Sequence, residues 1–294
     1  MQSSPDEALV RRLIAAQFPQ WAELSVTPVR SAGTDNDMYR LGDSLAVRLP
    51  KTADTARSIG KEQRWLPHIA PHLPMPVPVP VGKGTPGEGF DLPWSVYRWL
   101  DGGNAFDEPI ADLGHAAVEL GRFGAALRRV DASGGPKSFR GGHVTEWGGE
   151  HMAGAVHALA AEGSLDGELA TSAWESVLRL PQWERPPVWV HGDLLPGNLL
   201  TRAGRLSAVI DFGGIGTGDP ACDMMAAWTL LTPETRPLFR EAAEVDDATW
   251  DRGRGWALCW GVVTDHYYRV VNPVNPVLAS IARRTFAQAL AEYA

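Results

Sequence analysis

Short apolar runs separated by polar turns fill the first third of the chain. The runs of strand length are Val26–Val29, Met38–Leu41, Leu45–Leu49 and the segment that begins at Trp94. Helical spacing of apolar residues marks two further segments, at about residues 8–18 and 55–66. A proline-rich run from Pro71 to Pro80 must be extended and can pair only at a sheet edge. The pattern predicts a small sheet accompanied by two helices.

Helical periodicity takes over after Gly102-Gly103. Apolar residues recur every three or four positions from Ile110 to Val130, which indicates one buried stripe of a long helix. Further helices are predicted near residues 171–179, 234–243, 248–271 and 277–293. The change of pattern separates a strand-rich part, residues 1–100, from a mainly helical part, residues 101–294. The predicted fold class is therefore α+β.

Two polar motifs interrupt the helical part, and each follows a short apolar strand. His191-Gly192-Asp193 follows the first strand, and Asn198 comes five residues after Asp193. Residues 199–210 then read as a hairpin with a Gly-containing loop, and Asp211 follows it directly. Such a hairpin would bring Asn198 and Asp211 to the same end. Two carboxylates and an amide converging at strand ends would form an oxygen site suited to Mg²⁺, with phosphate oxygens completing the shell.

The two motifs together carry a family resemblance. With HGDLLPGNLL starting at His191 and VIDFGGIGTGDP starting at Val209, the chain resembles the aminoglycoside phosphotransferase family, which includes macrolide phosphotransferases and has a protein-kinase-like fold. The resemblance implies two lobes. Residues 1–100 would form a nucleotide-binding N-lobe with a small antiparallel sheet, and residues 101–294 a larger, mainly helical C-lobe for catalysis and substrate binding.

The same resemblance assigns chemical roles. It implies that Asp193 is the catalytic base, that Asn198 and Asp211 hold Mg²⁺, and that ATP or GTP is the phosphoryl donor. Arg48, on the third strand, would bind the donor phosphates and be oriented by Glu62. The alternative for Arg48 is a solvent-facing position on an edge strand. The remaining nucleotide contacts expected are Gly33, Thr34, Tyr97, Arg98, Trp99 and Leu100.

Four other residues complete the expected site. His191 and Asp223 would support the catalytic loop, the latter by holding its backbone. In the resembled family the C-terminal helices form the substrate wall, which makes Asp265 and Tyr268 candidate substrate contacts beside Asp193.

Composition limits the kinds of binding partner that we expect for this protein. The formal net charge of −8 argues against nucleic acid and is mildly favourable for a cationic substrate. The two cysteines, Cys222 and Cys259, lie in apolar helical patterns and are expected to be reduced core residues. The N-terminal residues lack the features of a signal peptide, and no apolar run reaches the length of a membrane span. We therefore expect a cytoplasmic enzyme, a monomer or weak dimer, with no membrane partner.

The expected reaction is transfer of the γ-phosphoryl group of a nucleoside triphosphate to a hydroxyl of a small molecule. An antibiotic of the aminoglycoside, macrolide or a related type is the first candidate substrate. A metabolic kinase for a sugar, a choline-like alcohol or an amino-acid alcohol is the alternative within the same chemistry. A catalytically silent kinase-like binding protein is the alternative from another class, and the intact Asp193, Asn198 and Asp211 argue against it.

Overall fold

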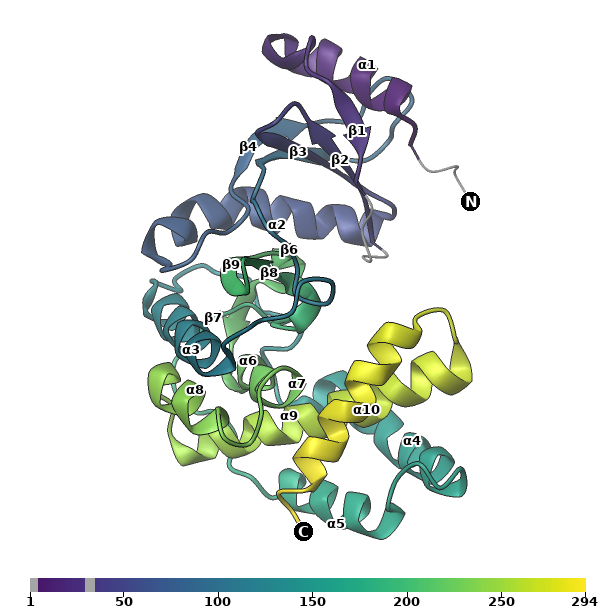
Figure 1. The fold of residues 1–294 in the computed structure, drawn as a ribbon, viewed down its shortest axis with the longest axis vertical. Helices are drawn as coiled ribbons and strands as arrows, with labels where there is room; N and C mark the ends of the chain where they lie inside the picture. The colour runs from purple at the N-terminus through teal and green to yellow at the C-terminus, as the bar shows by residue number, and fades with distance from the viewer. Residues whose placement is uncertain (1–4, 30–34) are drawn as a thin grey trace. The chain divides into compact units, whose positions relative to one another are not determined.

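The computed structural model describes residues 5–29 and 35–294 (Figure 1). The chain forms two compact units. Unit 1 comprises Met1–Glu108 together with Gly197–Ile215, and unit 2 comprises Pro109–Pro196 together with Gly216–Ala294. The hairpin segment 197–215 thus belongs to unit 1 although it lies late in the sequence. The predicted α+β fold class is confirmed.

Unit 1 contains all but two of the strands in the described residues. Its elements are α1 (Glu7–Gln17), β1 (Val26–Pro28), β2 (Asn36–Leu41), β3 (Leu45–Pro50), α2 (Ala53–Ile69), β4 (Pro80–Gly84), β5 (Trp94–Arg98), β6 (Gly103–Asn104), β8 (Leu199–Arg202) and β9 (Arg205–Val209). Unit 2 is mainly helical. Its elements are α3 (Leu113–Arg129), α4 (Glu150–Ala161), α5 (Gly167–Leu178), β7 (Val188–Val190), β10 (Gly216–Gly218), α6 (Ala221–Met224), α7 (Ala226–Thr229), α8 (Arg236–Ala243), α9 (Asp247–His266), the π-helical turn η6 (Tyr267–Val271) and α10 (Pro276–Leu290).

The large sheet of unit 1 has the strand order β1-β2-β3-β5-β4, and all its neighbours pair antiparallel. The proline-rich run leads into β4 at the edge, as its missing N–H groups require. Strand β3 is the central strand, and all six of its residues are buried. Arg48 therefore does not lie on an edge strand, and the solvent-facing alternative for it is wrong.

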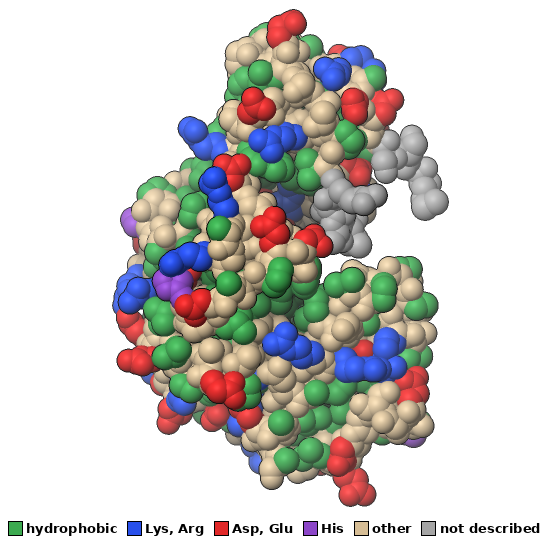
Figure 2. Space-filling model, viewed as in Figure 1, with side chains coloured by type: hydrophobic (Ala, Val, Ile, Leu, Met, Phe, Trp, Pro, Cys, Tyr) green, Lys and Arg blue, Asp and Glu red, His purple; other side chains and the backbone are tan. Residues whose placement is uncertain are grey.

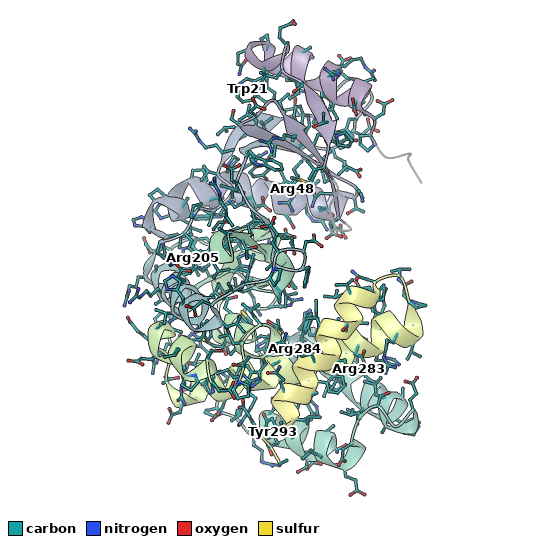
Figure 3. The ribbon with its side chains drawn as sticks, viewed as in Figure 1. Trp21, Arg48, Arg205, Arg283, Arg284 and Tyr293 are labelled. Carbon is teal, nitrogen blue, oxygen red and sulfur yellow. The ribbon has the colours of Figure 1, made fainter. Side chains whose placement is uncertain are left out.

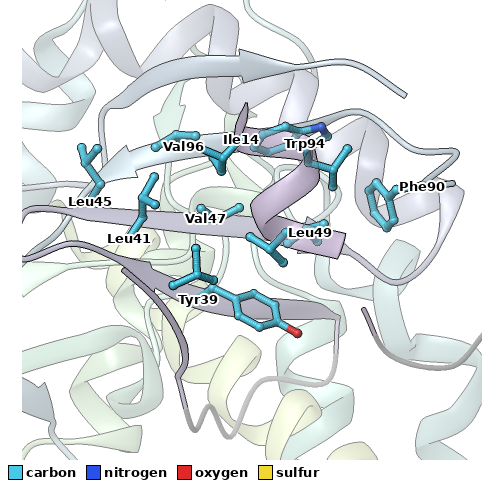
Figure 4. Packing of buried hydrophobic residues seen from close by; sticks show 12 residues of the cluster. Ile14, Tyr39, Leu41, Leu45, Val47, Leu49, Phe90, Trp94 and Val96 are labelled. Atoms are coloured by element: carbon cyan, nitrogen blue, oxygen red, sulfur yellow. The ribbon is translucent and has the colours of Figure 1, made fainter. Parts of the chain in front are cut away.

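Side-chain alternation gives the sheet two different faces. One face packs on α1 and forms a wholly hydrophobic core that includes Val47, Leu49 and Val96 (Figure 4). Successive side chains of a strand point to opposite faces, so Arg48, between Val47 and Leu49, and Tyr97, next to Val96, lie on the other face. Helix α2 covers that face and is tied to β5 by the Gln63 side chain, which donates to Ser95 Oγ at 2.6 Å.

A smaller three-stranded sheet, β6-β8-β9, lies in the same unit. Strands β8 and β9 form the predicted hairpin, in which Leu199 pairs with Val209. Beyond the last pair, the Ile210 N–H donates to the Asn198 carbonyl at 2.9 Å. At the open end of the hairpin Asn198 therefore lies opposite Ile210, and Asp211 follows directly, so both residues are at the same end, as the sequence predicts.

Unit 2 is organised by two helix pairs, α3 with α8 and α9 with α10. Helix α9 buries an aromatic stripe at first, because Trp256 and Trp260, which lie four residues apart, are almost fully buried. The stripe fails at Tyr267, which is 43% exposed. There the chain changes to the π-helical turn η6, whose wider repeat shifts the phase of every later side chain.

Both cysteines are buried free thiols of unit 2. Burial raises the pKa of Cys259 to about 12 and that of Cys222 well above its usual range, so both are protonated and unreactive at neutral pH. Among the helices of residues 5–29 and 35–294, none has both the length and the apolar character needed to cross a bilayer.

Candidate active site

A buried cluster of three polar side chains lies under the sheet of unit 1. Arg48 from β3 donates through one guanidinium nitrogen to both carboxylate oxygens of Glu62 on α2, at 2.8 and 2.9 Å. The Tyr97 hydroxyl, from β5, donates to the same carboxylate at 2.7 Å. Glu62 is fully buried, and Arg48 and Tyr97 are 8% and 3% exposed. Figure 3 shows where Arg48 lies in the unit.

Burial and charge act against each other in this cluster. Burial raises the pKa of Glu62, and the Arg48 guanidinium opposes that shift. Burial alone would lower the pKa of Arg48, but the Glu62 and Asp211 carboxylates outweigh it and the pKa is raised. An Arg whose charge is held by two carboxylates remains a cation under all ordinary conditions. Arg48 is therefore a permanent cation whose position is fixed by Glu62 and Asp211.

Asp211 connects this cluster to the hairpin. Its Oδ1 accepts from the second terminal nitrogen of Arg48 at 3.1 Å. Its backbone is left-handed, with φ of 60° and ψ of 66°, a conformation that non-glycine residues rarely adopt and that tends to occur at functional positions. The side chain is 47% exposed. Asp211 thus presents its carboxylate outward while one oxygen remains bound to Arg48.

The segment after Asp211 is held by a residue that sequence reasoning missed. Lys61, next to Glu62 on α2, donates to the carbonyl of Gly213 at 2.9 Å and lies 3.4 Å from that of Ile215. Burial lowers the pKa of Lys61. Two consecutive residues of α2 therefore secure the strand cation and the loop after Asp211. The only sequence signal was an ordinary helical Lys-Glu pair.

The oxygen donors of the hairpin fit a magnesium ion. In residues 5–29 and 35–294, no three His, Cys, Asp or Glu side chains gather into a site made of protein ligands alone. Asp211 and Asn198 lie at one end of the hairpin and supply a carboxylate and an amide oxygen. Two protein oxygens, with phosphate and water completing the shell, is the usual arrangement for Mg²⁺ bound with a nucleotide. Arg48 occupies only one oxygen of the exposed Asp211 carboxylate, which leaves it able to ligate.

In unit 2, the loop after β7 carries Asp193, and the Asp223 side chain holds the backbone of this loop. The buried Asp223 carboxylate accepts from the backbone N–H groups of His191 and Gly192, at 2.8 and 2.9 Å. Gly192 has a φ of +77°, which strains any residue with a Cβ. His191 is fully buried, and its Nδ1 accepts from the Asp193 N–H at 3.2 Å. Two buried side chains therefore set the backbone conformation that presents Asp193.

Arg140 also contacts this loop, and no sequence pattern pointed to it. Its terminal nitrogen donates to the Gly192 carbonyl at 2.8 Å and to Asp193 Oδ1. The guanidinium stacks on Phe139 and Trp147, with its carbon 4.8 and 5.2 Å from the ring centroids. Arg140 is only 8% exposed, whereas the Asp193 side chain is 27% exposed. A rigid cation thus fixes one carboxylate oxygen of a partly exposed aspartate.

The two predicted substrate contacts have different environments. Asp265 is completely buried, and both of its oxygens accept from Arg269 at 2.9 and 3.1 Å. Arg283 on α10 lies 3.8 Å from the same carboxylate (Figure 3). Tyr268 is half-buried and packs edge-on against Tyr267. The Asp265 carboxylate therefore faces arginines inside the helical unit rather than solvent.

The structure also places the expected nucleotide contacts at the end of β5 and just after it. Tyr97 points its side chain at Glu62, and its backbone pairs with strands on both sides. The Trp99 N–H donates to the Ser44 carbonyl at 2.8 Å, and Arg40 stacks on the Trp99 ring. Arg98 is exposed and Leu100 half-buried. Gly33 and Thr34 lie outside the described residues.

Comparison with known proteins identifies the family of this chain. Residues 26–256 match the phosphotransferase enzyme family, and the chain belongs to that family. It is therefore an enzyme that transfers phosphate, with a kinase-like fold, and the resemblance inferred from the two motifs is confirmed. No curated protein matches it in sequence.

Solved structures share the fold over nearly the whole chain. The GDP complex of wild-type aminoglycoside 2'-phosphotransferase-IIIa superposes with a TM-score of 0.72, at 20% identity, covering 98% of this chain and 99% of that one. Macrolide 2'-phosphotransferase MphH from Brachybacterium faecium gives 0.62, also at 20% identity, over 96% and 97%. The streptomycin–ATP–APH(2")-IIa ternary complex gives 0.60 at 17% identity, over 97% and 99%.

Proposed function

We propose that the protein transfers the γ-phosphoryl group of ATP or GTP to a hydroxyl of a small-molecule antibiotic. The observation that carries the proposal is the Arg48 guanidinium, which is buried, held by Glu62 and in contact with the exposed carboxylate of Asp211. Fold relatives that bind GDP, or ATP with an aminoglycoside, support a nucleotide donor and a small acceptor. ATP and GTP are cytoplasmic, so the proposed reaction also implies that location.

On the donor side, Arg48 binds the α and β phosphates, and Glu62 keeps its guanidinium in place. Asn198 and Asp211 would hold Mg²⁺, and the bound ion would supply neutralisation of the phosphate charge. The backbone of Arg98, Trp99 and Leu100 contacts the nucleotide base. Residues 1–100 supply most of these groups, and residues 101–294 supply the rest together with the acceptor site.

On the acceptor side, Asp193 orients the substrate hydroxyl and takes its proton. A bond forms between the hydroxyl oxygen and the γ-phosphorus, and the bond from that phosphorus to the β–γ bridging oxygen breaks. The nucleoside diphosphate leaves with that electron pair. Asp223 and His191 support the loop, and Arg140 holds the Asp193 carboxylate. Positioning and charge neutralisation supply most of the rate enhancement in such reactions.

Among antibiotics, the C-terminal helices favour an apolar substrate. Asp265, the acid expected to meet an ammonium group, is buried and paired with arginines. Five exposed side chains around η6 and the start of α10 are apolar instead: Tyr267, Val270, Val271, Val274 and Val277. The exposed charges on α10 include the cations Arg283 and Arg284, which would repel an ammonium group. Figure 2 shows hydrophobic side chains at this end of unit 2. A broad apolar surface suits a macrolide better than a polycationic aminoglycoside.

A coupled phosphorylation assay tests the proposal directly. The purified protein is offered macrolides, aminoglycosides, sugars, choline-like alcohols and amino-acid alcohols, each with ATP and with GTP, and with Mg²⁺ present or chelated. We expect Mg²⁺-dependent turnover with antibiotics, fastest with macrolides. Turnover confined to a metabolic alcohol would reassign the substrate, and binding without hydrolysis of either nucleotide would reject an active kinase.

Removing the Arg140 side chain should lower the turnover rate without weakening the binding of the nucleotide donor. With Arg140→Gln we expect kcat to fall by about 10- to 100-fold, because Asp193 loses the contact that orients it. The KM for the nucleotide should stay unchanged, since the lost contact lies on the acceptor side. Steady-state kinetics measures both. Arg252→Gln is the matched control: it removes another buried arginine of the same unit, one that pairs with Asp219. An equal fall in kcat for both variants, tracking lost thermal stability, would show that Arg140 is only structural.

A further inference from the structure

The Glu62 carboxylate accepts hydrogen bonds from side chains on two different strands. Arg48 reaches both of its oxygens from β3, and the Tyr97 hydroxyl reaches Oε2 from β5 at 2.7 Å. Strands β3 and β5 are hydrogen-bonded neighbours, with Ala46 opposite Tyr97 and Arg48 opposite Ser95. The two donors therefore come from adjacent strands on the same face of the sheet.

Tyr97 is a stiff support for this carboxylate. Its strand lies between β3 and β4, so its backbone is fixed by pairing with Ala46 on one side and Pro80 on the other. A phenol has few rotatable bonds and is almost completely buried here. Burial raises the pKa of Tyr97 well above its usual range, with a further contribution from Glu62, so the hydroxyl keeps its proton and remains a donor.

Glu62, by contrast, sits on a helix and needs such a support. A carboxylate bound only to Arg48 could turn about its terminal bond and still satisfy the guanidinium with one oxygen. With Tyr97 holding Oε2, one nitrogen of Arg48 is fixed on Glu62 and the other faces Asp211 at 3.1 Å. The orientation of the guanidinium then depends on the phenol through the carboxylate.

We propose that Tyr97 is a positioning residue for the donor phosphates: its hydroxyl fixes Glu62, and Glu62 in turn aims Arg48. This inference rests on the proposed role of Arg48 in binding phosphate. It replaces the expectation that Tyr97 contacts the nucleotide directly. Tyr97 then affects binding of the phosphate end of the donor and not of the base. A positioning role should therefore change the affinity for the triphosphate but not the affinity for the nucleoside.

Tyr97→Phe removes only the hydroxyl and tests the inference. We expect the affinity for the Mg²⁺-bound triphosphate to fall about tenfold, the scale of one hydrogen bond to a charged group. The affinity for the matching nucleoside, adenosine or guanosine, should not change, because it has no phosphate for Arg48 to bind. Isothermal titration calorimetry measures both ligands on both proteins. A Tyr97 hydroxyl that contacted the base directly would make the variant weaker for nucleoside and triphosphate alike, and that result would overturn the inference, as would no change in either.

Two further variants separate positioning from folding. Tyr39→Phe is the matched control, because Tyr39 lies on the opposite face of the same sheet and donates to the Pro5 carbonyl; its nucleotide affinity should equal that of the wild type. In a Glu62→Ala background, Tyr97→Phe should cause no additional loss of triphosphate affinity, since the acceptor through which it acts is gone. Full additivity of the two changes would contradict the inference.

The failure of this inference is distinct from failure of the proposed function. If the wild-type protein binds neither ATP nor GTP, the proposed phosphate role of Arg48 fails first. If the wild type binds a triphosphate and Tyr97→Phe binds it equally well, only the positioning role of Tyr97 is lost.

Discussion

Replacing Asp193 with alanine is expected to lower kcat by about 10²- to 10⁴-fold, the range associated with a group that accepts a proton in the transition state. The acceptor hydroxyl would lose both its orientation and its proton acceptor. The nucleotide should still bind, because Asp193 makes no proposed contact with the donor. Steady-state assays of product formation, with the best substrate found in the phosphorylation assay, measure kcat. Calorimetry measures the affinity for the nucleotide.

Two comparisons make the Asp193 result specific. Asp166 caps α5 in the same unit, where its side chain accepts from the Leu169 N–H at 3.0 Å, so Asp166→Ala removes a structural aspartate and should leave kcat unchanged. Asp193→Asn keeps the shape and the hydrogen-bonding oxygen but is far less basic, and we expect it to be nearly as inactive as the alanine variant. Near wild-type turnover in Asp193→Ala would remove this residue from the mechanism.

Replacing Asp211 with alanine should abolish the part of the nucleotide affinity that depends on Mg²⁺. This carboxylate is the proposed anionic ligand at the hairpin, and Asn198 alone offers a neutral oxygen. Without Mg²⁺ the affinity should not fall, because removing a negative charge next to Arg48 favours the approach of phosphate. Titrations of ATP and GTP with Mg²⁺ and with a chelator measure the difference. Turnover should be lost in parallel.

The matched control for Asp211 is Asp91→Ala, which removes an exposed carboxylate from the same unit. It should keep the full response to Mg²⁺. An Asp211→Ala protein whose nucleotide affinity still rises with Mg²⁺ as in the wild type would mean that the metal is held elsewhere. The expectation that Asn198 and Asp211 act together would then have to be abandoned.

Local sequence patterns were enough to predict which residues lie at the open end of the hairpin. Asn198 and Asp211 lie within a short stretch whose apolar runs and Gly-containing loop permit essentially one antiparallel pairing, so their convergence could be read from the residues between them. The Arg48–Glu62 pair needed more, because its two residues lie on different elements. The kinase-like spacing of the later motifs supplied that link, and the hydrogen bond from Arg48 to Glu62 confirms that the two side chains meet.

Arg140 and Tyr97 show why other parts could not be predicted. Arg140 lies in a glycine-rich loop and meets Gly192 across 52 residues of chain, so no periodicity connects them. Tyr97 belongs to an aromatic strand in which either face could be the core. Its partner became clear only from the pairing of β5 with β3, which places it on the face of Arg48. Asp265 carried a usable signal, because Arg269 follows four residues later in η6, which continues directly from α9, but Arg283 comes from α10.

The sequence by itself determined the fold class, the positions of most helices and strands, and the presence of an Asp-Asn-Asp signature on strand ends. These features depend on periodicity and on turn chemistry, which act between residues close together in the chain. Only the tertiary structure decided which buried charges meet: Tyr97 and Arg48 on Glu62, Lys61 on the loop after Asp211, Arg140 on Asp193, and the arginines on Asp265. A buried charge needs a partner but does not specify which one, and the packing of distant elements makes that choice.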